Sequence, residues 1–201
     1  MDALLGLSRA IDRVTEWIGR ASIWLILAAI LVSATNAIIR KAFSTSSNAW
    51  LELQWYLFGG AFMFAAAYTL KHNEHIRIDI FYGSRSRRTQ HWIDLFGHVF
   101  FLMPFVLLMT WMLVPYFLQS WRSGQVSTNA GGLVIWPARA ILLAGFALLS
   151  LQGLSEIIKK IAVMRGIIPD PTPTMTAQEL AAREAELAAA AIIPKDEEVR
   201  R

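Results

Sequence analysis

Apolar residues along this chain are gathered into four long blocks that polar and charged segments separate. The blocks cover residues 21–39, 50–70, 92–118 and 134–154. A helix of about twenty predominantly apolar residues is long enough to cross the hydrocarbon core of a bilayer. The pattern therefore predicts an all-α membrane protein with four transmembrane helices, in a transmembrane domain of residues 21–165.

Residues 1–20 show a different pattern, in which apolar and charged positions alternate at helical spacing. The recurring apolar positions are Leu4, Leu7, Ile11, Val14 and Ile18. A helix with one apolar and one charged face can lie in the plane of the membrane interface. We therefore expect an N-terminal amphipathic interfacial helix; the alternative is a soluble extension of the first span.

The end of the chain is rich in proline and then in alanine and glutamate. Pro169, Pro171 and Pro173 form a break, and Thr176 with Glu179 matches a capping box that would start a short helix. Residues 166–201 are expected to be a cytosolic tail that is partly helical or disordered.

Two prolines fall inside the third apolar block. Pro104 and Pro115 each lack the N–H that an α-helix needs, so we expect kinks at these positions. The block is also longer than a bilayer requires, which indicates a tilted helix or one that extends out of the membrane.

Composition narrows the classes of function. The chain has 201 residues, 55% hydrophobic content, a formal charge of +4 and no cysteine. Without cysteine there is no disulfide and no thiolate ligand. The basic residues flank the apolar blocks and form no separate patch, so a nucleic-acid partner is not expected. The sequence also lacks a nucleophile triad, a phosphate loop and paired catalytic carboxylates, which predicts a protein that is not an enzyme.

Histidines do not indicate a haem or metal site. His72, His75 and His91 lie in or beside the polar connection after the second block, whereas an axial ligand would be placed inside facing helices. No cofactor and no metal are therefore expected.

The distribution of basic residues predicts the orientation of the spans. On one side of the four spans lie Arg9, Arg13, Arg20, Lys71, Arg77, Arg85, Arg87, Arg88, Lys159, Lys160 and Arg165. The opposite side holds only Arg40, Lys41 and Arg122. Cytoplasmic loops carry the excess of lysine and arginine, so both termini are expected in the cytoplasm.

Three charged residues are expected at similar depth near the outer end of the bundle. Glu52 starts the second span, Arg40 ends the first, and Arg139 lies one turn inside the fourth. An unpaired charge at this depth is costly. We expect Glu52 to pair with Arg139 or Arg40; the alternative is that each side chain reaches the headgroups separately.

Asp94 and His98 lie four residues apart near the inner end of the third span, on one helix face. They could form a proton or ion relay, although an orientation toward a partner or the interface is the favoured interpretation.

Several short motifs resemble those of a known family. They are Asn36 with Arg40, Trp50-x-Glu52 before Tyr56-Leu57-Phe58, and His75-x-Arg77-x-Asp79. Together with the four-span layout, over roughly residues 20–165, they resemble the small, DctQ-like permease subunit of TRAP (tripartite ATP-independent periplasmic) transporters. The chain departs from the common pattern at Leu51 and Trp55, where many members carry a second acid and an arginine.

The resemblance implies a multi-pass protein of the bacterial inner membrane. Its partners would be a large permease subunit in a stable heteromer, a periplasmic substrate-binding protein in transient contact, and membrane lipids. The assembly would carry out sodium-coupled uptake of an organic acid, with this chain as a scaffold. The motif residues and Arg139 would then be structural or interface residues, and this subunit would hold no substrate.

Two other functions remain open from the residues alone. A self-sufficient small proton-coupled transporter would use Glu52 as its coupling site. A membrane anchor subunit of a respiratory enzyme would need axial histidines inside the spans, where only His98 qualifies.

Overall fold

The computed structural model describes residues 1–45, 47–73 and 86–170. Within these ranges the chain is all-α, as expected from the apolar blocks. The helices are α1 (Asp2–Phe43), α2 (Asn48–His72), α4 (Arg87–Gly97), the π-helical turn η1 (His98–Leu102), α5 (Met103–Ser123) and α6 (Trp136–Met164). His75, Arg77, Asp79 and nearly all of the expected cytosolic tail lie outside the described residues.

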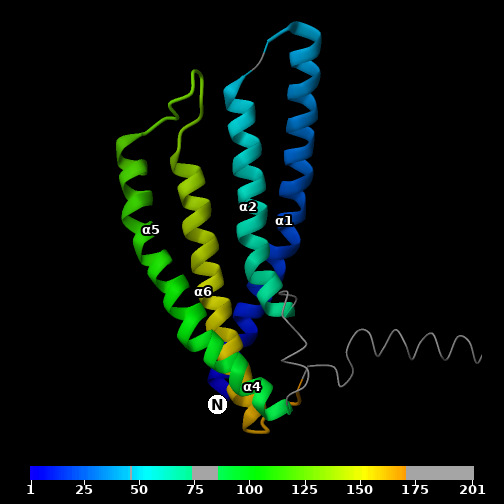
Figure 1. Ribbon diagram of the computed structural model, residues 1–201, viewed down its shortest axis with the longest axis vertical. Helices are drawn as coiled ribbons and strands as arrows, with labels where there is room; N and C mark the ends of the chain where they lie inside the picture. Colours follow the sequence, from blue (N-terminus) through cyan, green and yellow to red (C-terminus); the bar gives the residue numbers. More distant parts are fainter. Residues whose placement is uncertain (46, 74–85, 171–201) are drawn as a thin grey trace, which may run out of the picture. The chain divides into compact units, whose positions relative to one another are not determined.

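The helices run alternately up and down, and α6 is the helix that the others share (Figure 1). It packs against α1, α2, α4 and α5, while α1 and α2 also pack side by side. The C-terminal end of α1, the N-terminal end of α2 and the connection 124–135 lie at the same end of the bundle in Figure 1. The distribution of basic residues predicts that this end is the outer one.

α1 is one uninterrupted helix of 42 residues. The structure thus places no break at residue 20, where the interfacial helix was expected to end and the first span to begin. The buried positions of its first half are Ser8, Ile11, Thr15, Gly19 and Ser22. Apart from Ile11, small and polar residues therefore face the bundle.

The apolar residues that suggested an interfacial face of α1 are mostly exposed. Leu4, Leu7 and Val14 are about half exposed, whereas Ile11 is buried. This arrangement leaves apolar side chains free to meet lipid, and a membrane-surface position for residues 1–20 stays a prediction.

The third apolar block is a composite of α4, η1 and α5. The π-helical turn ends two residues before Pro104, and the Met103 N–H bonds to the His98 carbonyl oxygen five residues earlier. A proline clashes with the carbonyl of the residue four positions before it, and a wider turn relieves that clash. Pro115, by contrast, lies inside α5, and the helix continues through it.

Three of the described helical stretches are long and apolar enough to cross a membrane. They are Asp2–Phe43, Arg87–Ser123 and Trp136–Met164. The role of α2 as the fourth span stays a prediction, which its packing between α1 and α6 supports.

Glycines allow the helices to approach closely at defined points. A Cβ on Gly19 would overlap the Tyr68 side chain, and one on Gly145 would come within 2.7 Å of Met63. Membrane helices associate through this kind of small-residue contact, since apolar burial provides little driving force in lipid. α2 is thereby fixed closely against both α1 and α6.

Candidate functional site

The carboxylate of Glu52 binds the loop between α5 and α6. Its Oε1 accepts hydrogen bonds from the Ser127 hydroxyl and, at 2.8 Å, from the Asn129 amide. Its Oε2 accepts from the Leu133 backbone N–H at 2.7 Å. A negatively charged acceptor makes the stronger class of hydrogen bond. Glu52 therefore holds residues 127–133 against the first turns of α2.

The loop has the conformation needed to surround this carboxylate. Ser127 N–H bonds to the Leu133 carbonyl oxygen at 2.9 Å, and Val126 pairs with Val134 in an antiparallel bridge. A Cβ at Gly132 would lie 2.9 Å from Glu52 Oε1 and 2.6 Å from the Ser127 Cβ. Glycine at 132 is thus required for the close approach of carboxylate and loop.

Two further side chains of α2 bind the same loop. The Asn48 amide donates to the Ala130 carbonyl oxygen at 2.9 Å, and the Tyr56 hydroxyl donates to that of Val134 at 3.1 Å. Asn48, Glu52 and Tyr56 are spaced four residues apart and so lie along one helix face. We call this set, with the loop residues that they contact, the outer clamp.

Arg139 lies near the outer clamp but has partners of its own. Its guanidinium donates to the Tyr116 carbonyl oxygen at 3.1 Å and lies 3.6 Å from the centre of the Tyr116 ring. The residue is only 7% exposed, and its Nε has no acceptor among the described residues. Arg139 therefore connects α6 to α5 through a cation–π contact.

The expected ion pair of Glu52 with Arg139 or Arg40 is wrong for this structure. The carboxylate is occupied by loop donors, and the arginine stacks on a tyrosine. The ion pairs of the described residues do not include either combination. Loop N–H and O–H groups satisfy the carboxylate without an opposite charge.

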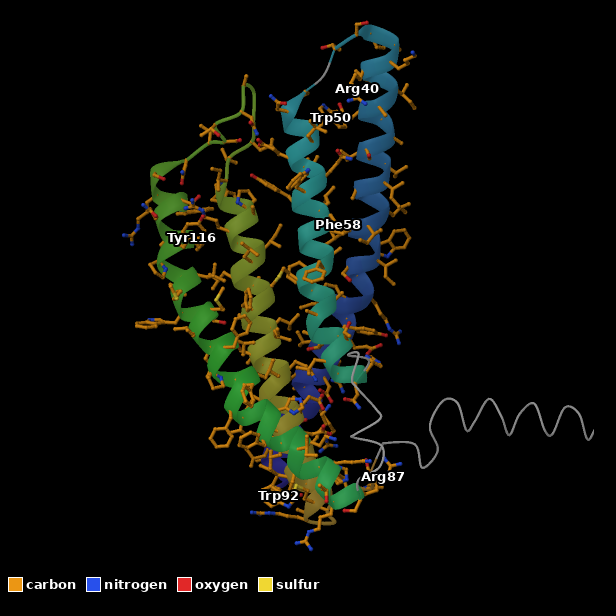
Figure 2. All side chains as sticks on the ribbon, viewed as in Figure 1. Arg40, Trp50, Phe58, Arg87, Trp92 and Tyr116 are labelled. Atoms are coloured by element: carbon orange, nitrogen blue, oxygen red, sulfur yellow. The ribbon has the colours of Figure 1, made fainter. Side chains whose placement is uncertain are left out.

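Three other motif residues that the structure describes, Asn36, Arg40 and Trp50, lie at the same end of the bundle. Arg40 is exposed near the end of α1, and Trp50 in the first turn of α2 is 38% exposed (Figure 2). Asn36, one turn before Arg40, is buried. The structure thus brings the Asn36–Arg40 segment and the Trp50-x-Glu52 segment to one end of α1 and α2.

A second polar cluster joins the N-terminal part of α1 to α6. Asp12 Oδ1 accepts from Gln152 Nε2 at 2.9 Å and from the Ser155 hydroxyl at 2.8 Å, and Lys159 Nζ lies 3.0 Å from Asp12 Oδ2. The Ser8 and Ser155 hydroxyls are 2.7 Å apart. Gln152 is fully buried. We call this set the inner cluster.

Asp12 precedes the uncharged stretch that begins at Ala21. The pKa of its carboxyl group reflects the partners that it has in the inner cluster. Burial by itself raises the pKa of the carboxyl group, but the Gln152 hydrogen bond and the Lys159 ammonium favour the charged form. The net result is a pKa below the ordinary value.

A third set of ion pairs joins α1 to α2. Glu16 accepts from Lys71 Nζ at 2.6 Å and from its helical neighbour Arg20 at 2.7 Å. These hydrogen bonds, with that of Lys71 the strongest, hold the pKa of the Glu16 carboxyl below its usual value. Lys71 lies in the last turn of α2, so the pair fixes the end of that helix against α1.

Asp94 pairs with Lys160 of α6 at 2.7 Å, in a nearly buried contact. His98 Nδ1 lies 2.6 Å from the backbone oxygen of Asp94. The Asp94 carboxylate therefore connects α4 to α6. The described residues contain no group of three or more histidine or acidic side chains that could hold a metal ion.

Sequence reasoning missed the partners that matter most. Ser127, Asn129 and Leu133 bind Glu52 from more than seventy residues away, and no local pattern reveals that contact. A signal did exist for the inner cluster: Gln152, Ser155 and Lys159 recur at three- and four-residue spacing where the fourth block becomes polar.

The polar side chains of the outer clamp and of the inner cluster bind mainly one another. The outer clamp and the inner cluster both connect elements far apart in sequence.

The model of one protein family, described as the DctQ component of tripartite ATP-independent periplasmic transporters, matches residues 29–163. No curated protein and no solved structure matches the chain.

Proposed function

The chain belongs to the DctQ family of TRAP transporter components, and we propose that it is the scaffold for the large permease subunit of such a transporter. In this proposal the large subunit carries the substrate, an organic acid, in symport with sodium. A periplasmic binding protein delivers that substrate. The match over residues 29–163, which covers the bundle from the middle of α1 to the end of α6, is the observation that carries the proposal.

The geometry supports a passive structural role for this subunit. Glu52 is engaged by three donors of the loop, which favours a structural role for its carboxylate over a role in transport. Asp12, Glu16 and Asp94 are each engaged by a lysine on another helix. Such cross-links favour a rigid bundle, which is what a scaffold beside a moving partner requires.

The proposal extends to location and orientation. The protein would lie in the bacterial inner membrane with α2 as its fourth span, the outer clamp on the periplasmic side, and both termini in the cytoplasm. The inner cluster and the Glu16–Lys71 pair would then lie at the cytoplasmic ends of the helices. The motif residues His75, Arg77 and Asp79 would belong to the cytoplasmic connection.

Co-purification tests the scaffold role. An affinity tag on this chain should recover its cognate large permease subunit in mild detergent at a fixed stoichiometry, measured by native mass spectrometry. A matched tag on an unrelated four-span protein is the control. Recovery of this chain alone, with the large subunit fully folded in the same membranes, would contradict the proposal.

A further inference from the structure

Arg139 is a buried cation for which the described residues supply no opposite charge. It is 7% exposed, and its guanidinium has the Tyr116 carbonyl oxygen and the Tyr116 ring as its partners. Figure 2 labels Tyr116 on α5. A carbonyl dipole and a ring face offset only part of the cost of moving a full charge out of water. The environment of Arg139 is therefore one that favours an anion.

The carboxylates within the described ranges have partners of their own or lie far from Arg139. Both oxygens of Glu52 accept hydrogen bonds from the loop. Asp2 lies in the first turn of α1, and Asp170 has an interaction of its own. The remaining carboxylates all pair with lysines in the inner half of the bundle; they belong to Asp12, Glu16, Asp94 and Glu156. An anion for Arg139 must therefore come from outside the described chain.

A buried hydroxyl provides a second, independent observation at the same place. Ser120 is fully buried, and its Oγ has no hydrogen-bond partner among the residues that the structure describes. It follows Tyr116 by one helical turn, and a helical side chain lies over the turn that precedes it. The hydroxyl is thus placed over the turn of α5 whose carbonyl oxygen accepts from Arg139. The Ser120 O–H and the Arg139 Nε–H are two unpartnered donors at this turn.

The start of α6 adds positive potential here. Arg139 is the fourth residue of α6, which begins at Trp136. Aligned peptide dipoles give a helix N-terminus about half a positive charge. The rings of Trp121 and Trp136 meet edge to face, with centres 4.6 Å apart, and join α5 to α6 beside the guanidinium. In such apolar surroundings electrostatic attraction is stronger than in water.

We propose that Arg139 and Ser120 bind one small monovalent anion of the chloride class between α5 and α6. The guanidinium supplies the charge, and the Nε–H and the Ser120 hydroxyl supply hydrogen-bond donors. A single positive charge calls for a single negative one, and the burial of both side chains favours an ion of one atom over a phosphate or an organic acid. The ion would hold α5 to α6, and this inference does not rest on the scaffold role.

Thermal unfolding of the full-length chain in detergent tests the binding. Replacing gluconate by chloride at constant ionic strength, from about 1 mM to about 300 mM, should raise the melting temperature by about 3 °C and then saturate. Equal melting temperatures in the two salts would overturn the inference. A rise that needs added anionic phospholipid rather than chloride would also overturn it, because the ligand would then be a headgroup phosphate.

Substitutions test which residues hold the ion. Arg139→Gln should abolish the chloride response, and Ser120→Ala should raise the chloride concentration of half effect by about tenfold, since a hydrogen bond to a charged ligand is lost. Tyr116→Leu removes the ring contact of Arg139 but neither donor, so it should keep the response. Arg40→Gln, at an exposed arginine, is the control and should also keep it. An unchanged response in both Arg139→Gln and Ser120→Ala would overturn the inference.

Bromide tests the position of the ion directly. It has the charge of chloride and scatters X-rays anomalously, so crystals grown in bromide should show an anomalous peak between Arg139 and Ser120. The peak should be missing in Ser120→Ala crystals grown at low bromide concentration. Anomalous peaks at other positions alone would show that this part of the α5–α6 interface binds no anion.

Discussion

At the scale of single residues, Glu52 illustrates how a carboxylate at one end of a helical bundle can be satisfied without an opposite charge. It was expected to pair with an arginine, since both signs occur at similar depth. The loop instead supplies two side-chain donors and one backbone N–H. The residue's chemistry was thus predictable from the sequence, but its partners were not, because they depend on how a distant loop folds.

Substitution of Glu52 should release the loop. Glu52→Ala removes all three acceptor contacts and Glu52→Gln keeps one oxygen, so hydrogen exchange at the Leu133 amide should rise in both and more in the alanine variant. Asp2→Asn, an exposed change at the start of α1, is the control and should leave this amide unaffected. Equal protection of Leu133 in all variants would show that Glu52 does not hold the loop.

Arg139 and Tyr116 should be energetically coupled. The guanidinium lies 3.6 Å from the ring centre, and a cation–π contact of this kind contributes about 1 kcal/mol. A double-mutant cycle of Arg139→Met and Tyr116→Leu, read from thermal unfolding in detergent, should give a coupling of that size. Additive effects of the two substitutions would refute the contact.

At the scale of helices, the apolar pattern predicted the existence of the elements better than their limits. The fourth block was expected to end at 154, yet α6 continues to Met164. Its polar extension is stabilised by contacts across helices, such as Lys159 with Asp12 and Lys160 with Asp94. Hydropathy depends only on how apolar the residues are. It therefore cannot predict that a polar segment continues a helix through contacts with neighbouring helices.

Helix packing at Gly19 can be tested against Gly59. Gly19→Ala places a Cβ in overlap with the Tyr68 side chain, so it should destabilise the isolated chain by about 1–3 kcal/mol through forced separation of α1 and α2. Gly59→Ala meets no atom and should be neutral or stabilising by about 0.5–1 kcal/mol. Thermal unfolding of the two variants in the same detergent measures the difference, and equal melting temperatures would contradict the packing.

The inner cluster should make the α1–α6 contact sensitive to acid. Because the folded pKa of Asp12 lies below its ordinary value of 3.8, the carboxylate stabilises the fold above that pH. This stabilisation is lost as the pH falls through the folded pKa. Hydrogen exchange in the first half of α1 should therefore increase below about pH 3.8 in the unmodified chain.

The Asp12→Asn variant should show weaker protection already at neutral pH and a flatter acid response. Glu16→Gln serves as the comparison, because it alters the α1–α2 junction and leaves Asp12 in place. If Asp12→Asn retained the full acid response, another group would be responsible.

At the scale of the whole molecule, the bundle is joined by polar contacts near both ends and by small residues along its length. This arrangement leaves the outer face of α1 and α2 rich in exposed aromatic and aliphatic side chains. The family could be identified from short motifs, although His75, Arg77 and Asp79 lie outside the described residues.

The orientation can be tested directly, since the chain has no cysteine. A single cysteine in place of Thr128, in the loop of the outer clamp, should react with a membrane-impermeant maleimide in spheroplasts. A single cysteine in place of Arg165, just after α6, should react only after the membrane is opened. The reverse pattern would invert the proposed topology.

The measurement that tests the central claim most directly is sodium-driven uptake into proteoliposomes. The compositions to compare are this chain alone, the large permease alone and both together, each with the cognate binding protein. The account predicts uptake only when both subunits are present. Uptake by the large permease alone at the same rate would show that no scaffold is needed, and uptake by this chain alone would make it a transporter in its own right.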